Sequence, residues 1–90
     1  MSHKCEIPLE DDSAELILEK GRLRIDLPIN AEMIYGEYDR LEGPLYVGYA
    51  ILQVKNSFTF LKVVYKKDRI MDVWYTCLKG YEVVESMISL

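Results

Sequence analysis

The chain has few of the side chains with which small proteins build catalytic or metal sites. Its 90 residues include one histidine, His3, and two cysteines, Cys5 and Cys77. A Ser-His-Asp or Cys-His arrangement would have to use a histidine at the chain end, where residues usually fray. Glycine-rich phosphate loops and spaced calcium ligands are also missing. We therefore expect no enzyme, no catalytic residues, no cofactor and no bound metal.

Long apolar stretches are absent as well. The longest, residues 45–52, is less than half of what a membrane span needs, and residues 1–6 offer no apolar core of a secretory signal peptide. With no Cys-x-x-Cys pair, Cys5 and Cys77 are expected to be free thiols in a reducing compartment. A single Cys5–Cys77 disulfide is the alternative. The sequence thus predicts a cytoplasmic protein without a membrane partner.

Positive charge is in deficit, mainly in the first half of the chain. The sequence has 15 acidic and 11 basic residues, a net charge of −4, and 11 of the acidic ones precede residue 46. Such asymmetry can steer a protein toward a basic partner, although solvated surfaces are often uneven too. The residues considered for an acidic binding surface are Glu10, Asp11, Asp12, Glu37, Asp39 and Glu42.

The first structural signal is a β-hairpin. Residues 15–19 and 22–27 alternate apolar and charged side chains around Lys20-Gly21, a two-residue loop in which glycine suits a positive φ. The expected pairs are Leu18–Leu23 and Leu16–Ile25 on one face, and Glu19–Arg22 and Ile17–Arg24 on the other. A slip of one residue would mix the two faces, so this register is strongly specified.

Residues 30–42 fit a helix. Asn30 is typical of an N-cap, and Gly43-Pro44 supplies a stop. The apolar residues at helical spacing are Ala31, Ile34, Tyr38 and Leu41. Gly36 weakens a helix by about 1 kcal/mol relative to alanine. The alternative is a bent strand through Ala31, Met33 and Tyr35.

The remaining residues fit an antiparallel meander, with strands over 45–54, 58–66 and 70–78. Residues 81–90 fit either a last strand or a short helix. The expected fold class is therefore α+β and β-rich: an N-terminal hairpin, one helix at about 30–42, a three-stranded meander and this final element. A small barrel is one way to close such a sheet. The length allows one domain over residues 1–90, with residues 1–6 as a flexible tip.

Hydrophobic residues are in surplus in the meander. An even-length turn at residues 67–68 pairs Tyr65 with Ile70, and the same register places Phe60 opposite Tyr75. Both faces are then largely apolar, so either the hairpin and helix cover them both or one is exposed for a partner. The residues chosen for such a contact patch are Phe60, Met71, Trp74 and Tyr75.

One strand also combines aromatic and basic side chains, a pattern on which single-stranded nucleic acid can stack. The residues of this alternative face are Phe58, Phe60, Lys62, Lys66, Lys67 and Arg69. The net charge of −4 weighs against it, because nucleic-acid binding usually leaves a basic footprint.

These observations favour a small non-catalytic protein-binding module that acts as an adaptor, regulator or inhibitor of a larger protein. Missing catalytic residues and surplus aromatic surface both support this hypothesis. Single-stranded nucleic-acid binding is the first alternative, and a small enzyme or enzyme subunit without a recognisable motif is the second. A homodimer through unprotected sheet edges is a further expectation.

Overall fold

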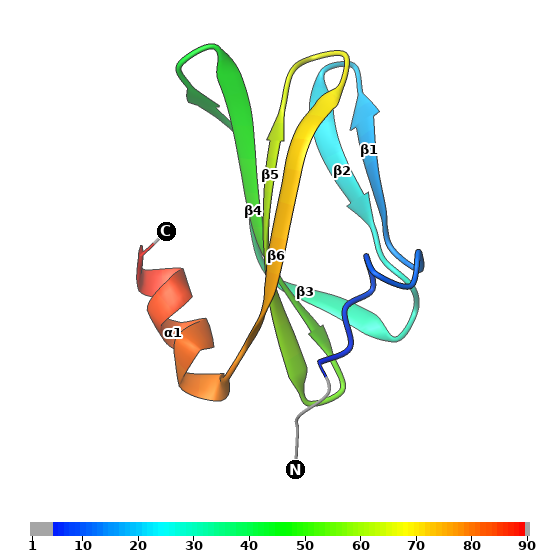
Figure 1. Ribbon diagram of the computed structural model, residues 1–90, viewed down its shortest axis with the longest axis vertical. Helices are drawn as coiled ribbons and strands as arrows, with labels where there is room; N and C mark the ends of the chain where they lie inside the picture. The colour runs from blue at the N-terminus through cyan, green and yellow to red at the C-terminus, as the bar shows by residue number, and fades with distance from the viewer. Residues whose placement is uncertain (1–4, 90) are drawn as a thin grey trace.

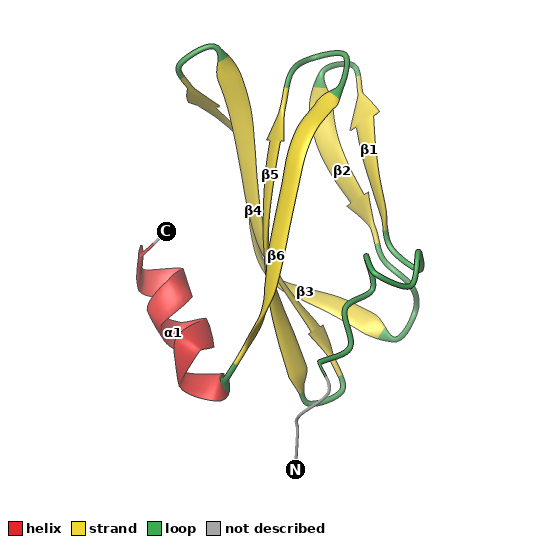
Figure 2. Ribbon diagram, in the orientation of Figure 1, coloured by secondary structure: helices red, strands yellow, loops and turns green. Residues whose placement is uncertain are grey.

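Two antiparallel sheets and one helix make up the part of the chain that the computed structural model describes, residues 5–89 (Figure 2). The larger sheet has four strands in chain order, β3-β4-β5-β6, and the smaller is the hairpin β1-β2. The bounds are β1 Glu15–Glu19, β2 Arg22–Asp26, β3 Ala31–Glu42, β4 Leu45–Val54, β5 Ser57–Tyr65, β6 Ile70–Leu78 and α1 Gly80–Ser89. The hairpin and α1 lie on opposite sides of the larger sheet (Figure 1).

The larger sheet is open. β3 and β6 form its two edges, so the sheet does not close into the small barrel that was one possibility, whereas the β-rich α+β class is confirmed. Residues 80–89 adopt the helical one of the two expected forms, and Leu90 lies outside the described residues. Within residues 5–89, α1 is too short to cross a membrane.

The hairpin forms in the predicted register. Leu18 pairs with Leu23 and Leu16 with Ile25, and the charged pairs also form as expected. Lys20 and Gly21 both have positive φ, 53° and 77°, as a tight hairpin turn requires. The apolar side of the hairpin packs against the sheet, where Leu23 is buried. The alternation of side chains therefore decides which face of the hairpin is covered.

The predicted helix at residues 30–42 is wrong, because Ala31–Glu42 is the strand β3, paired with β4 along its length. The register shifts between Met33 and Tyr35 and again between Glu37 and Arg40. Each irregularity adds a residue to a pattern of period two, which is how β-bulges act. The apolar residues consequently recur at intervals of three and four, which imitates a helix. The bent-strand alternative is the correct one.

The three meander strands lie where they were predicted, but the register between β5 and β6 differs. Tyr65 pairs with Ile70 as expected, and then Val64 pairs with Asp72, which leaves Met71 as the extra residue of a bulge. All later predicted pairs are wrong by one position: Phe60 faces Thr76 and Leu61 faces Tyr75. Because one added residue reverses the faces of a strand, this bulge moves Tyr75 to the hairpin side of the sheet.

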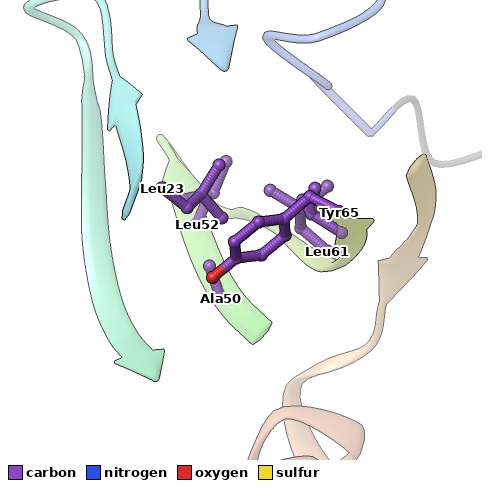
Figure 3. Close-up of a cluster of buried hydrophobic side chains, with 6 residues drawn as sticks. Leu23, Ala50, Leu52, Leu61 and Tyr65 are labelled. Carbon is purple, nitrogen blue, oxygen red and sulfur yellow. The ribbon is translucent and has the colours of Figure 1, made fainter. Parts of the chain in front are cut away.

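The core lies between the hairpin and the larger sheet. Its fully enclosed side chains surround the ring of Tyr65, which Figure 3 shows among Leu23, Ala50, Leu52 and Leu61. Gly48 lets the hairpin approach this closely, since a Cβ there would lie 2.8 Å from Leu23 Cδ2. The best-packed surface of the sheet thus faces the hairpin.

A hydrogen-bonded group links the hairpin to the sheet beside this core. The Tyr65 hydroxyl donates to Asp39 Oδ1, which also accepts from the Leu23 amide at 3.2 Å. The Asp39 amide donates to the Tyr65 oxygen at 2.6 Å. Burial, together with the hydrogen bond to Asp39, raises the pKa of Tyr65 well above its usual value. Asp39 lies in the second irregularity of β3, between Glu37 and Arg40, and its backbone has a positive φ of 61° there.

We predict that Tyr65→Phe lowers the free energy of unfolding by about 1–3 kcal/mol at neutral pH, because Asp39 loses a donor. Because folding raises its pKa, the protonated Tyr65 hydroxyl stabilises the folded state. That contribution is complete below the unfolded-state value of about 10 and is lost as pH rises above it. Urea unfolding at neutral and alkaline pH should therefore show a steeper alkaline loss for the wild type than for Tyr65→Phe. Parallel curves would contradict this assignment.

Cys5 and Cys77 form a disulfide, so the prediction of two free thiols is wrong. Their Cα atoms lie 5.8 Å apart, although 72 positions separate them in the sequence. The Glu6 amide also donates to Ser57 Oγ at 3.2 Å. Cys5 and Glu6 are therefore both tied to the larger sheet. The rest of the predicted flexible tip, residues 1–4, lies outside the described residues. Free thiols therefore no longer indicate a reducing compartment, and the cytoplasmic location stays a prediction.

Candidate functional site

The candidate site is the face of the larger sheet that points away from the hairpin. Tyr49, Lys62 and Trp74 are neighbours across β4, β5 and β6, and Phe60 follows on the same side of β5. Residues at the intervening positions, such as Leu61, belong to the core on the hairpin side. Tyr35 of β3 pairs with Ile51, which shares the outer side of β4 with Tyr49. We call Tyr35, Tyr49, Phe60 and Trp74 the aromatic face.

Three of its rings form a continuous row across the sheet. The ring centres of Tyr49 and Phe60 are 5.9 Å apart, and Phe60 meets Trp74 edge-on at the same distance. Lys62 Nζ lies 6.0 Å from the centre of the Tyr49 ring, at the limit of a cation–π contact. Offset and edge-on contacts of this kind are favourable for aromatic pairs, so they help to hold the three rings in place.

The β3 side of the aromatic face is polar. The Tyr35 hydroxyl donates to Glu37 Oε2 at 3.0 Å, and this bond to a carboxylate raises the pKa of Tyr35. Glu37 Oε1 lies 4.0 Å from Arg40 Nη1, and Glu42 is 3.9 Å from the same guanidinium. These ion pairs are about half exposed and add little to stability. An apolar centre beside a charged border is typical of protein-binding surfaces.

Among the described residues, α1 lies on the same side of the larger sheet as the aromatic face and covers only one end of that side. It contacts β5, with Val83 buried, and its start lies by Asn56 and Ser57, at the turn between β4 and β5. Trp74 remains 51% exposed. The helix also leaves apolar side chains in solvent, namely Tyr81, Val84, Met87 and Ile88. Large exposed apolar residues therefore occur on both the sheet and the helix of one side of the molecule (Figure 1).

The structure separates the four residues of the predicted contact patch. Phe60 and Trp74 touch each other on the aromatic face. Met71 is the unpaired bulge residue and is exposed. Tyr75 packs against the core on the hairpin side, so it does not belong to the same surface.

The residues of the alternative nucleic-acid face also divide. Phe58, Phe60 and Lys62 share the outer side of β5. Lys66, Lys67 and Arg69 lie at the turn that leads into β6, and the stem of Lys67 lies against Gly21 of the hairpin. Of these six residues, only Phe58, Phe60 and Lys62 share a side with the aromatic row, and Lys62 is the one among them that carries charge.

The predicted acidic surface has local partners at several positions. Glu10, Asp11 and Asp12 lie in one turn, where Asp11 Oδ1 accepts from the Ser13 amide at 2.9 Å. Hydrogen bonds from Ser13 lower the pKa of Asp11. Asp39 is turned toward Tyr65 and Leu23. The remaining two carboxylates, Glu37 and Glu42, face Arg40.

Residues 5–89 contain no cluster of three or more metal-ligating side chains, and His3 lies outside that range. A pocket of about 570 Å³ lies beside the disulfide, between the start of α1 and the β4–β5 turn. Glu82 lines it, and its carboxylate accepts a hydrogen bond from the Lys79 amide at 2.7 Å. Comparison of the chain with known protein families, with curated proteins and with solved structures found no match.

Sequence reasoning missed Tyr35 and Tyr49. Tyr35 lies in the segment that was expected to be a helix. Tyr49 lies in a strand that is apolar on both sides, so the sequence did not indicate toward which side its ring points. The pairing of β3 with β4 would have identified Tyr35, and the pairing of β4 with β5 places Tyr49 on the same side as Phe60.

Proposed function

We propose that this chain is a non-catalytic module that binds a larger protein through the aromatic face. The observation that carries the proposal is the row of Tyr49, Phe60 and Trp74 on a side of the sheet that α1 covers at one end only. Tryptophan and tyrosine dominate the binding energy of many protein interfaces because they bury large areas with little loss of side-chain entropy. Such a module can act as an adaptor, a regulator or an inhibitor.

The test compares two substitutions of exposed apolar residues. Trp74→Lys places a charge at the exposed β6 end of the aromatic face, whereas Ile29→Lys changes a fully exposed residue in the loop before β3. With the tagged chain as bait in lysate of the cells that make it, we expect a stoichiometric protein with the wild type and with Ile29→Lys. Trp74→Lys should weaken binding at least about 30-fold, as loss of a tryptophan that anchors an interface does.

Circular dichroism of both variants shows whether each retains its fold, which separates lost binding from lost structure. Equal recovery by Trp74→Lys and Ile29→Lys would contradict the proposal, since binding would then be independent of the aromatic face. So would a folded wild-type bait that recovers no protein.

Single-stranded nucleic acid is the second candidate ligand. The observation that favours it is Lys62 beside Tyr49 in a row of rings on which bases could stack. Anisotropy of a labelled oligonucleotide at low salt, where phosphate contacts are strongest, tests this directly. Binding that Trp74→Lys and Lys62→Ala both weaken would assign the aromatic face to nucleic acid. An unchanged anisotropy would remove this candidate.

A further inference from the structure

Beyond the bulge at Met71, β6 is an edge strand without the usual protection. Its nine residues contain no glycine, proline or lysine, and Asp72 is its one charged residue. From Asp72 to Leu78 it pairs regularly with β5, and within residues 5–89 no strand pairs with its other side. In Figure 1 it lies in front of the other strands of the sheet, with its outer edge toward the viewer. Unpaired backbone groups of this kind form a template for another strand.

The other strand edges carry the devices that prevent such pairing. β3 has two register irregularities, Gly36 in its middle and several charged residues toward its end. β1 and β2 are only five residues long, and charged side chains occupy both ends of each. Short, charged or irregular edges disfavour the addition of a strand. Among the described strands, β6 therefore has the edge that is most open to pairing with a further strand.

We propose that β6 pairs antiparallel with β6 of a second copy of this chain. A two-fold axis perpendicular to the sheet near Tyr75, the middle of the regular segment, would join the two four-stranded sheets into one continuous sheet. The two aromatic faces would then lie on the same side. Strand pairing satisfies the backbone groups of both edges at once, because an isologous contact presents the same groups from each copy.

The charge pattern of β6 supports a second copy as the occupant. In this register each Asp72 lies opposite residue 78 of the other copy. The two Asp72 side chains are therefore six positions apart along the paired strands. That separation is about 20 Å. It exceeds the Debye length of about 8 Å at physiological salt, so the two carboxylates would repel weakly. The remaining residues of the segment are β-branched, aromatic or otherwise uncharged, which suits strand pairing.

Light scattering after size-exclusion chromatography of the full chain tests the proposal without any other protein present. We expect a mass of twice 10.5 kDa at millimolar concentration and a decline toward 10.5 kDa on dilution. Hydrogen exchange should show alternate amides of β6 gaining protection as concentration rises, because alternate N–H groups of an edge strand point outward. A monomer over the whole range would overturn the proposal and leave the edge for a strand of a different protein.

Two proline substitutions locate the interface. The N–H groups of Tyr75 and Thr76 point in opposite directions, because they are neighbours in an antiparallel strand. One of the substitutions Tyr75→Pro and Thr76→Pro therefore removes a hydrogen bond to β5 and should destabilise the fold. The other removes only an outward N–H. The variant that keeps its unfolding midpoint should be monomeric. A stable variant that remains dimeric would overturn the β6 assignment. This outcome is independent of the aromatic face, whose test uses side chains that point out of the sheet.

Discussion

Removal of the Cys5–Cys77 disulfide is expected to lower the free energy of unfolding by about 4 kcal/mol. The disulfide closes a loop of 72 positions, and the chain-entropy argument gives a loss of this size for such a loop. Domains of this size have about 5–15 kcal/mol in total, so the reduced protein should be only marginally stable. Guanidinium unfolding of the wild type with and without a reductant measures the difference.

The double variant Cys5→Ala with Cys77→Ala is the matched control for this measurement. Its unfolding midpoint should equal that of the reduced wild type and should not respond to reductant. Thiol labelling of the unfolded, unreduced protein checks the bond itself and should detect no free thiol. Two labelled thiols, or a midpoint that reductant leaves unchanged, would contradict the link between the segment before β1 and β6.

Leu61→Ala is expected to lower the free energy of unfolding by about 2–5 kcal/mol. Leu61 is completely buried in the cluster around Tyr65, so the substitution leaves a cavity that neighbouring side chains fill only in part. Leu41→Ala makes the same chemical change at a side chain that is 64% exposed. We expect it to stay within about 0.5 kcal/mol of the wild type, as surface substitutions do. Urea unfolding of both variants measures the contrast.

Equal losses for the two leucine variants would contradict the division of the sheet into a core side and an outer side. That division also underlies the functional proposal, because Phe60 and Leu61 are adjacent in β5 and point in opposite directions. If Leu61 were not core, Phe60 would be the inward residue and the aromatic face would not exist.

Local pattern sufficed to predict the hairpin and the approximate bounds of the meander strands. In the hairpin the turn residues and the alternation of apolar and charged side chains agree, so only one register keeps the faces separate. The helix over residues 80–89 was one of two forms that the pattern allowed, and its packing on β5 settles the choice.

The sequence could not show the bulges, and the main errors follow from them. The two irregularities in β3 produced helical spacing, and the bulge at Met71 shifted the predicted pairing of β5 with β6 by one residue. The disulfide was only the alternative to free thiols, for a different reason. Its cysteines are brought together by the full course of the chain from β1 to β6, which no local pattern reports.

The candidate site was consequently predicted only in part. Phe60 and Trp74 were selected from the surplus of apolar residues, and the structure brings their rings together. Tyr75 was included because of the shifted register. Tyr35 was left out because residues 30–42 were expected to form a helix, and Tyr49 because its strand is apolar on both sides. Identifying an outer face requires the register of all four strands, whereas recognising a surplus of apolar residues requires only composition.

Trp74 offers the most direct measurement, because it is the only tryptophan and lies half exposed on the aromatic face. Acrylamide quenching of its fluorescence would be measured for the free protein and for its complex with the captured partner. Our account predicts ready quenching in the free protein, and a blue-shifted, protected emission once the partner is bound at stoichiometric ratio. Quenching that the bound partner leaves unchanged would contradict the claim that the aromatic face is the binding surface.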